Sequence, residues 1–433
     1  MLCMQVVIIG NGITGVTAAV TIRRLDPTAT ISLVSSESDH FYSRTALMYL
    51  YMGHMQYRHV KPYEDWFWAE QKINLIRNHV SAINFGAKEV FLDNETSLHY
   101  DKLLIATGSV PNKLGIAGEE LQGVQGFYSL QDLENLEKNS KNISRAVIAG
   151  GGLIGIELAE MFYTRCIPVT FCVREENYWG NILPPEEATI IEKHIRAHGL
   201  DLRLKTTLQE IIGDADGRAQ AIITGEGERI ECSLVSVAIG VAPNVGFLKG
   251  SDLEINRGVV VNDYLATNIP DVYAAGDCAE LNRGKDRKPL LEQLWYTGRM
   301  QGETVGYNIC GRPTKYERGI WYNSAKFFDI EYQTYGQVPA RLKAEEETLV
   351  WQHPTQNKLL RINYHSPSGK VLGFNLLGIR YRHEVCERWI KEEQSISYVV
   401  KHLREANFDP EFYRRHEKEI IREFCRQLSG VIS

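Results

Sequence analysis

The sequence predicts an α/β protein in which two similar doubly wound units are followed by a C-terminal region of mixed helices and strands. Its 433 residues are enough for about three domains. The composition, with 44% hydrophobic and 24% charged residues, is that of a folded globular chain rather than a disordered one. A strand–glycine–helix pattern occurs twice, and this repeat decides the fold class.

The repeat consists of VVIIGNGITGVTAAV at 6–20 and AVIAGGGLIGIELAE at 146–160, about 140 residues apart. Each copy has a short apolar run, a GxGxxG turn and an apolar helical segment, so each predicts a buried strand that leads into a helix. The glycines are Gly10, Gly12 and Gly15 in the first copy and Gly150, Gly152 and Gly155 in the second. The residues before each third glycine are Ile13, Thr14, Leu153 and Ile154.

The spacing of the three glycines matches the turn that holds a dinucleotide in a Rossmann-like domain. The first glycine allows the tight turn from strand to helix, the second lacks the Cβ that would block a pyrophosphate, and the third lets the helix pack on the strand. The phosphates then face the N-terminus of the helix, where free N–H groups favour an anion. Two such turns in the same context predict two dinucleotide-binding domains.

The residues after the second strand of each unit bear on how a ribose is bound. In the first unit, Glu37 is our candidate for the ribose hydroxyls, the alternative being a solvated loop charge. In the second unit, Arg174 could pair with a 2'-phosphate, which favours NADPH. Glu175 and Glu176 come next and could bind a free ribose instead, which keeps NADH as the alternative.

Three further segments carry a family resemblance. YDKLLIATGSVPN at 100–112 and SLVSVAIGVAPN at 233–244 are strands that end in a turn of small residues, and TNIPDVYAAGDCAE at 267–280 ends a strand on Gly276 and Asp277. With both glycine turns, this ordered set closely resembles the FAD-dependent pyridine nucleotide-disulfide oxidoreductase superfamily, from residue 5 to about 310. The resemblance implies FAD at the first glycine turn and NADPH or NADH at the second.

The resemblance also implies roles for single residues. Asp277 would hydrogen-bond the ribityl or pyrophosphate part of FAD, Val80 would offer its backbone to the adenine, and Glu157 would lie near the nicotinamide carboxamide. The turns of small residues supply further cofactor-binding candidates, which are Ala106, Thr107, Gly108, Gly240 and Gly276.

The cysteines indicate which branch of the superfamily the chain resembles. Disulfide-reducing members carry one or two cysteines on the helix after the FAD glycines, whereas HFYSRTALMYLYMG at 40–53 has none, so we expect no disulfide relay. The chain is more similar to the branch of ferredoxin reductases, rubredoxin reductase and the N-terminal part of NAD(P)H nitrite reductase. In that branch Arg44 would be a flavin-site residue, and Trp295 would lie against the isoalloxazine, the alternative being a core tryptophan.

The domain order of the superfamily implies a discontinuous FAD-binding domain at 1–112 and 245–318, with an NAD(P)-binding domain at 113–244. A C-terminal α+β interface domain would follow at 319–433, where short strand patterns give way to helical ones. Its last segment, 411–428, has the pattern of an amphipathic helical tail. The resemblance allows a homodimer through this domain.

We therefore expect an FAD-dependent NAD(P)H oxidoreductase in which hydride passes from nicotinamide to flavin N5. Electrons would then pass to an external acceptor, a small iron–sulfur carrier of the ferredoxin or rubredoxin type. No side chain is assigned a catalytic role of its own. Two alternatives remain open: an NAD(P)H oxidase or quinone reductase, and a redox-sensing interaction protein of the apoptosis-inducing-factor type.

Charge, cysteine spacing and hydropathy exclude other functions. A formal net charge of -6 argues against nucleic acid as a partner. The eight cysteines form no CxxC and no Cys/His cluster with zinc spacing, so we expect no metal site. No apolar stretch predicts a transmembrane helix and no signal peptide pattern precedes the first strand, so we expect a cytoplasmic location. A basic cluster could steer an acidic carrier, the alternative being a solvated charged face, and it consists of Arg380, Arg382, His383, Arg388 and Lys391.

Overall fold

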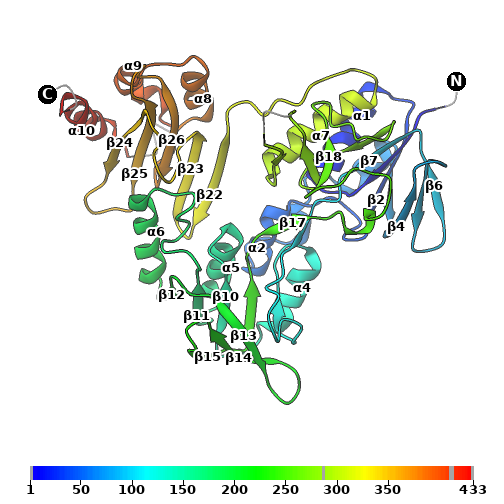
Figure 1. Ribbon diagram of the computed structural model, residues 1–433, viewed down its shortest axis with the longest axis horizontal. Helices are drawn as coiled ribbons and strands as arrows, with labels where there is room; N and C mark the ends of the chain where they lie inside the picture. Colours follow the sequence, from blue (N-terminus) through cyan, green and yellow to red (C-terminus); the bar gives the residue numbers. More distant parts are fainter. Residues whose placement is uncertain (1–2, 285–287, 409–413, 431–433) are drawn as a thin grey trace. The chain divides into compact units, whose positions relative to one another are not determined.

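The computed structural model describes residues 3–284, 288–408 and 414–430 (Figure 1). Contacts within the chain divide it into two compact units. The first comprises Met1–Lys113, Gln125–Lys141 and Gly240–Arg318, and the second comprises Leu114–Val124, Asn142–Ile239 and Gly319–Ser433. Each unit is therefore assembled from segments that are far apart in the sequence.

A five-stranded parallel sheet forms the centre of the first unit, in the order β19-β7-β1-β2-β3. The strands are β1 (Gln5–Ile9), β2 (Thr30–Ser35), β3 (Ile73–Arg77), β7 (Lys102–Ile105) and β19 (Val272–Ala274). Ile8 of β1 lies opposite Leu33 on one neighbour and Leu104 on the other, and all three are buried. Such continuous apolar strands are typical of a parallel sheet that is covered on both faces.

Helices α1 (Ile13–Leu25) and α7 (Trp295–Ile309) pack side by side in this unit (Figure 1). Glycines on α7 allow the close approach. A Cβ on Gly302 would lie 2.5 Å from the carbonyl oxygen of Thr14, and one on Gly306 would lie 2.8 Å from the side chain of Thr21. The spacing of four residues places these glycines on one face of the helix, which fixes its distance from α1.

Smaller sheets and short helices complete the first unit. One antiparallel sheet consists of β4 (Val80–Asn84), β5 (Glu89–Leu92) and β6 (Ser97–His99). A second sheet consists of β18 (Val259–Val261), β20 (Ala279–Leu281) and β21 (Leu290–Leu291), and β8 (Ser109–Pro111) pairs with β17 (Val241–Pro243). The helices are α2 (Leu47–Tyr51), α3 (Asp65–Glu70) and α4 (Leu130–Asn139).

The second unit contains its own five-stranded sheet, in the order β12-β11-β10-β16-β9. The parallel strands are β10 (Ala146–Ala149), β11 (Val169–Cys172), β12 (Asp201–Arg203) and β16 (Leu234–Val237), with β9 (Val124–Gln125) at the edge. Helix α5 (Leu153–Thr164) follows β10, and α6 (Pro185–Ala197) precedes β12. An antiparallel sheet is formed by β13 (Leu208–Gly213), β14 (Ala219–Thr224) and β15 (Arg229–Glu231).

An antiparallel sheet in the order β22-β23-β26-β25-β24 is also part of the second unit. Its strands are β22 (Tyr322–Phe327), β23 (Ile330–Gly336), β24 (Glu346–Gln352), β25 (Leu359–His365) and β26 (Val371–Leu377). Helices α8 (His383–Lys391), α9 (Ile396–His402) and α10 (Glu417–Gly430) accompany it, and Phe374, Trp389 and Phe424 are buried in their shared core. The expected α/β fold class with a C-terminal α+β region is thus confirmed.

The C-terminal tail contains a helix that is shorter than the sequence pattern predicts. Helix α10 begins at Glu417, and residues 409–413, where the predicted helix starts, lie outside the described part of the chain. Ile420 and Phe424 of α10 are buried in the C-terminal core, which accounts for the amphipathic pattern. Within the described ranges, no helix combines the length and the apolar character that crossing a membrane requires.

Candidate dinucleotide-binding sites

The first glycine turn joins β1 to α1, and its backbone leaves no room for side chains at the first and third glycines. Gly10 has a φ of +111°, and a Cβ there would lie 2.1 Å from the carbonyl oxygen of Ala106. A Cβ on Gly15 would lie 2.0 Å from the carbonyl oxygen of Gly10. These glycines let β1, α1 and the turn after β7 approach one another closely.

Gly12, the N-cap residue of α1, differs from both, because a Cβ there would meet no atom within 4 Å. Its φ of -72° and ψ of -177° are open to any residue, so the backbone itself does not require glycine. The glycine keeps space free in front of the first helical turn, where backbone N–H groups lack intrahelical acceptors. A pyrophosphate fits this position, since a helix N-terminus attracts anions.

Glu37 and Arg44, predicted separately for the first cofactor site, form a bidentate ion pair. Arg44 donates from Nη1 to Oε1 of Glu37 at 2.8 Å and from Nη2 to Oε2 at 2.6 Å. The hydroxyl of Tyr42 and the backbone N–H of Leu130 also donate to Oε1 of Glu37. Burial acts to raise the pKa of Glu37, but Arg44 and Tyr42 outweigh it and hold the pKa below its usual value.

Arg44 also connects Glu37 to Asp277 through a chain of hydrogen bonds. Its Nη1 donates to the carbonyl oxygen of Tyr128 at 2.6 Å, and its guanidinium lies 4.3 Å from the centre of the Tyr128 ring. The Tyr128 hydroxyl accepts from the N–H of Ser109 at 3.1 Å, and Ser109 Oγ donates to Asp277 Oδ2 at 2.9 Å. Burial raises the pKa of Asp277, and the bond from Ser109 opposes that effect.

Other residues predicted for FAD lie in the same unit. Thr107 and Gly108 follow β7, where the hydroxyl of Thr107 donates to the backbone at 2.7 Å and Gly108 has a φ of +71°. Gly276, with a φ of +80°, turns the chain between β19 and Asp277. Val80 begins β4 and is buried. Gly240, a cofactor-binding candidate that was not assigned to FAD, also belongs to this unit and has a φ of +95°.

Trp295 is the first residue of α7, and its indole Nε1 is buried with no hydrogen-bond partner among the described residues. A buried donor without an acceptor costs about 1–3 kcal/mol. A bound group that offers an acceptor at this point would remove the cost. FAD carries oxygen and nitrogen acceptors that meet this requirement. Its pyrophosphate also fits the open space at Gly12, which lies in the same unit.

The second glycine turn, between β10 and α5, has the same construction as the first. Gly150 has a φ of +115°, and a Cβ there would lie 2.2 Å from the carbonyl oxygen of Ala238. A Cβ on Gly155 would lie 2.2 Å from the carbonyl oxygen of Gly150, whereas one on Gly152 would approach nothing closer than 4.0 Å. The helices begin with Ile13 and Thr14 after the first turn and with Leu153 and Ile154 after the second. A second pyrophosphate therefore fits at Gly152.

Glu157 lies on α5, just beyond this turn, and is half-buried. Burial raises its pKa to about 7, and the negative charge of Glu160 adds to the effect. The hydroxyl of the fully buried Tyr178 lies 3.5 Å from the carbonyl oxygen of Gly152. Burial, with a smaller contribution from Glu157, also raises the pKa of Tyr178.

Arg174 and the glutamates that follow it lie at the surface of the second unit. The side chain of Arg174 is 77% exposed, and its Nη2 lies 3.0 Å from Oε1 of Glu175. Glu176 is paired with Lys205 at 2.6 Å. Arg174 can leave its neighbour at little cost, because exposed ion pairs contribute only about 0–1 kcal/mol.

Comparison with known proteins agrees with this geometry. The family model described as pyridine nucleotide-disulphide oxidoreductase matches residues 4–302. The chain belongs to this family. The match includes both glycine turns and the segment with Gly276 and Asp277, so family membership confirms the expected cofactors of the oxidoreductase, FAD and NAD(P)H.

Relatives of this oxidoreductase include nitrite reductase [NAD(P)H] of Bacillus subtilis, which is 30% identical over 76% of this chain and 40% of the relative. The chain therefore spans less than half the length of that relative. Rubredoxin-NAD(+) reductase of Pseudomonas putida is 28% identical over 72% of this chain and 81% of the relative. A solved ferredoxin reductase from Rhodopseudomonas palustris has a TM-score of 0.78 and 22% identity, covering 86% of this chain and 91% of that one.

These relatives confirm the expected branch of the family. They also confirm the expected enzyme class, an FAD-dependent NAD(P)H oxidoreductase. All eight cysteines are free thiols, and none lies between residues 40 and 53. Sequence reasoning assigned no role to four polar residues that contact predicted site residues: Tyr42 at Glu37, Tyr128 at Arg44, Ser109 at Asp277 and Tyr178 at Gly152.

Proposed function

We propose that this chain passes electrons from NAD(P)H through FAD to a small iron–sulfur carrier of the ferredoxin or rubredoxin type. The main support is the combination of two open glycine turns with a segment at 40–53 that has no cysteine. With no cysteine in this segment the chain supplies no thiol relay, so electrons from bound FAD would pass directly to an acceptor outside the protein. Rubredoxin-NAD(+) reductase, among the relatives, is named for an acceptor of this kind.

In this proposal the first unit binds FAD and the second binds NAD(P)H. The two cofactors, when bound, supply the hydride and electron chemistry, in which flavin N5 accepts hydride from nicotinamide. Gly12 and Gly152 leave room for the two pyrophosphates, and Asp277 and Trp295 offer polar atoms to FAD. Glu157 orients the nicotinamide half of NAD(P)H.

We also propose a domain organisation of 1–112 with 245–318 for FAD, 113–244 for NAD(P)H, and 319–433 as the interface domain. It is supported by the two long segments of the first unit, Met1–Lys113 and Gly240–Arg318, which lie close to the limits proposed for the FAD domain. The parallel sheet of the second unit and its C-terminal antiparallel sheet are separate sheets, which supports two domains there. One segment departs from these limits, since Gln125–Lys141, with α4, groups with the first unit.

The basic cluster of the C-terminal region does not by itself provide a surface for an acidic carrier. Arg380, Arg388 and Lys391 each pair with a glutamate of the same unit. Arg382 donates to a backbone carbonyl, and His383 lies 3.5 Å from a glutamate on its own helix. Because these partners neutralise most of the positive charge, we assign no carrier site to this cluster.

Stopped-flow mixing of the FAD-loaded protein with NADPH or NADH tests the first half of the proposal. The flavin absorbance should bleach with at least one of the two nucleotides, because hydride transfer reduces the isoalloxazine. A flavin that neither nucleotide bleaches would refute the oxidoreductase mechanism for this chain.

The second half of the proposal is tested by comparing electron acceptors. Reduction of cytochrome c should be fast only when ferredoxin or rubredoxin is added, and reactions without carrier are the matched control. Faster turnover with oxygen or a quinone would instead support an oxidase or quinone reductase. Slow reoxidation by every acceptor, with a nucleotide-dependent change in the size of a homodimer, would support a redox-sensing protein.

A further inference from the structure

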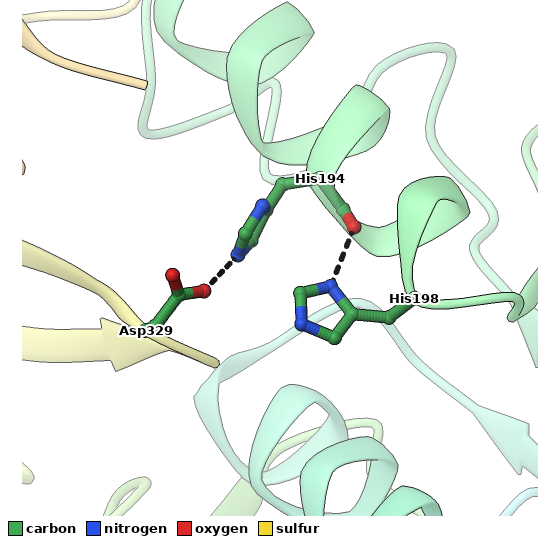
Figure 2. A group of neighbouring side chains, drawn as sticks. All are labelled: His194, His198 and Asp329. Atoms are coloured by element: carbon green, nitrogen blue, oxygen red, sulfur yellow. Dashed lines mark hydrogen bonds and ion pairs between the residues drawn. The ribbon is translucent and has the colours of Figure 1, made fainter. Parts of the chain in front are cut away.

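Two histidines and an aspartate meet in the second unit, at a place that the proposed cofactor chemistry does not use. His194 lies in the last turns of α6, His198 follows the end of that helix, and Asp329 lies in the turn between β22 and β23. Figure 2 shows the three side chains pointing toward one another from the helix and the hairpin. One ligand atom from each, a ring nitrogen or a carboxylate oxygen, lies within 4.8 Å of the other two.

The hydrogen bonds of His198 leave one ring nitrogen available for a metal. Its Nδ1 lies 2.9 Å from the carbonyl oxygen of His194 (Figure 2). Because a carbonyl can only accept, Nδ1 carries the proton and the lone pair is on Nε2. A backbone carbonyl that fixes the tautomer in this way is the usual outer partner of a metal-binding histidine.

His194 has a hydrogen-bond partner on each of its ring nitrogens. Its Nε2 lies 2.5 Å from Oδ1 of Asp329, and Nδ2 of Asn357 lies 3.0 Å from its Nδ1, so Nδ1 accepts and Nε2 carries the proton. Rotating the Asn357 amide by half a turn exchanges Nδ2 for the acceptor Oδ1, so Asn357 can accept from Nδ1–H when Nε2 binds a cation. A metal at the centre of the group would thus replace the proton between His194 and Asp329.

Packing holds the two rings in place while one side of the group stays open to water. The ring of Phe328 stacks on His198 with centroids 4.2 Å apart and an interplanar angle of 21°. Only 9% of the His194 side chain is exposed, against 80% for Asp329. The group therefore has an apolar floor and an opening at the carboxylate, through which an ion and a water ligand can enter.

An independent contact fixes α6 against the C-terminal sheet and so determines where the group meets. Glu187, near the start of α6, is fully buried and accepts from Nε of Arg361 and from the amide of Asn375, both at 2.7 Å. Arg361 and Asn375 lie on β25 and β26. The start of α6 is therefore held on the C-terminal sheet, and this contact keeps the end of the helix next to the β22–β23 turn.

We propose that His194, His198 and Asp329 bind a divalent transition metal of the Zn²⁺ class. Two imidazole nitrogens and one carboxylate oxygen are ligands that Zn²⁺ accepts, and the open side allows a water molecule as the fourth. The metal fastens the end of α6 to the β22–β23 turn. This site is independent of the two dinucleotide sites, so its test does not depend on the proposed electron transfer.

A second group of similar composition, His353, His416 and Glu419, does not meet the same conditions. His353 Nδ1 accepts two backbone N–H groups at 3.2 and 3.1 Å, and these donors, unlike the Asn357 amide at His194, cannot rotate to offer an oxygen. The ammonium of Lys358 lies 3.1 Å from His416 Nε2, where a cation would repel a metal. The two groups thus differ in the lone pairs that they leave free.

Zinc binding to the full chain with FAD bound tests the proposal. After treatment with a chelator and dialysis, the protein is titrated with Zn²⁺ in competition with a chromophoric indicator. We expect one saturable equivalent in the wild type and a loss of affinity of about tenfold or more in His198→Gln and in Asp329→Asn, since each removes a ligand. Zn²⁺ should also raise the melting temperature of the wild type and leave that of both variants unchanged.

His79→Gln is the matched control, because His79 forms an exposed pair with Asp93 at 3.3 Å but, among the described residues, belongs to no group of three possible ligands. It should bind Zn²⁺ like the wild type. Asp329 is exposed in a turn, so Asp329→Asn keeps the test decisive even if His198→Gln unfolds. Equal zinc affinity in the wild type and Asp329→Asn, or no saturable binding, would overturn the proposal and leave an ordinary His–Asp hydrogen bond.

Discussion

Glu157 occupies a half-buried position on α5, and ionising it there costs more than in water. Burial, with the nearby charge of Glu160, raises its pKa from 4.5 to about 7. Because the folded-state pKa lies above the unfolded value, the stability associated with the neutral carboxyl is complete below about pH 4.5 and is lost as the pH rises through 7. A shift of this size corresponds to at most roughly 3 kcal/mol.

We expect Glu157→Gln to remove this pH dependence, because glutamine stays neutral. The variant should melt above the wild type at about pH 8 and close to it near pH 4.5. Thermal unfolding followed by circular dichroism across that range measures the difference. The exposed Glu134 provides the control, Glu134→Gln, which should follow the wild type. Parallel profiles for Glu157→Gln and the wild type would contradict a raised pKa.

Arg174 allows the nucleotide preference to be tested at a single exposed side chain. If its guanidinium binds the 2'-phosphate of NADPH, Arg174→Ala should raise the KM for NADPH about tenfold and leave the KM for NADH unchanged. Steady-state kinetics with both nucleotides measures the two constants. Lys205→Ala removes another exposed cation that pairs with Glu176 and is the matched control. Unchanged constants for both nucleotides would show that Arg174 does not read the phosphate.

At the residue scale, the sequence predicted members of the first site but not the contacts between them. Glu37 and Arg44 were expected on separate grounds, as a ribose ligand and a flavin-site residue, yet they bind each other. Tyr128 lies 84 residues from Arg44, and no local spacing connects the two. The same limit applies to His194 and Asp329, which are 135 residues apart. Spacing rules find ligands on one element, whereas folding joins side chains from several.

At the scale of elements, the two glycine turns permit substitutions that separate folding from cofactor binding. Gly12→Ala and Gly152→Ala each add a methyl group where no atom lies closer than 4.0 Å, so both variants should fold. The methyl would occupy the space for a pyrophosphate. We expect Gly12→Ala to lose FAD affinity about tenfold or more while NADPH binding persists, and Gly152→Ala to show the reverse.

Flavin fluorescence on dilution and equilibrium dialysis with NADPH measure these two affinities. Gly10→Ala is the contrasting variant, because its Cβ would lie 2.1 Å from a backbone oxygen and its φ is +111°. It should lower the melting temperature, which the other two variants should not. If Gly12→Ala lost NADPH and kept FAD, the assignment of the two turns would be reversed.

The sequence predicts the first residues of helices that follow a glycine turn, but it does not predict the first residue of a helix that lacks one. The turns before α1 and α5 follow from glycine positions alone. The amphipathic pattern at 411–428 gave the buried face of α10 but not its first residue, Glu417. A tertiary contact lies at that point, where the amide of Asn407 donates to Glu417 at 2.8 Å. Helical periodicity carries no information about such a contact, so it does not predict where the helix begins.

At the scale of the whole molecule, the positions of the thiols bear on how many electrons the protein can take up, because a thiol pair beside the flavin would add a second redox centre. Cys278, next to Asp277, is fully buried, and its Sγ lies 3.4 Å from two backbone carbonyl oxygens. Burial raises the pKa of this thiol, which keeps it protonated and unreactive. The exposed thiols, Cys3, Cys166 and Cys425, lie outside the 40–53 segment. FAD is thus the single two-electron centre that we expect in this chain.

We therefore expect anaerobic titration with dithionite to reduce the protein fully with one pair of electrons per FAD. A member with a redox disulfide beside the flavin takes up a second pair, because the disulfide is reduced as well. Absorbance of the flavin against added reductant gives the number directly. Alkylation of the exposed thiols with N-ethylmaleimide is the control, and it should change neither the end point nor the rate of reduction by NAD(P)H. An end point at two pairs of electrons would show that a thiol couple takes part, contrary to the arrangement of the cysteines.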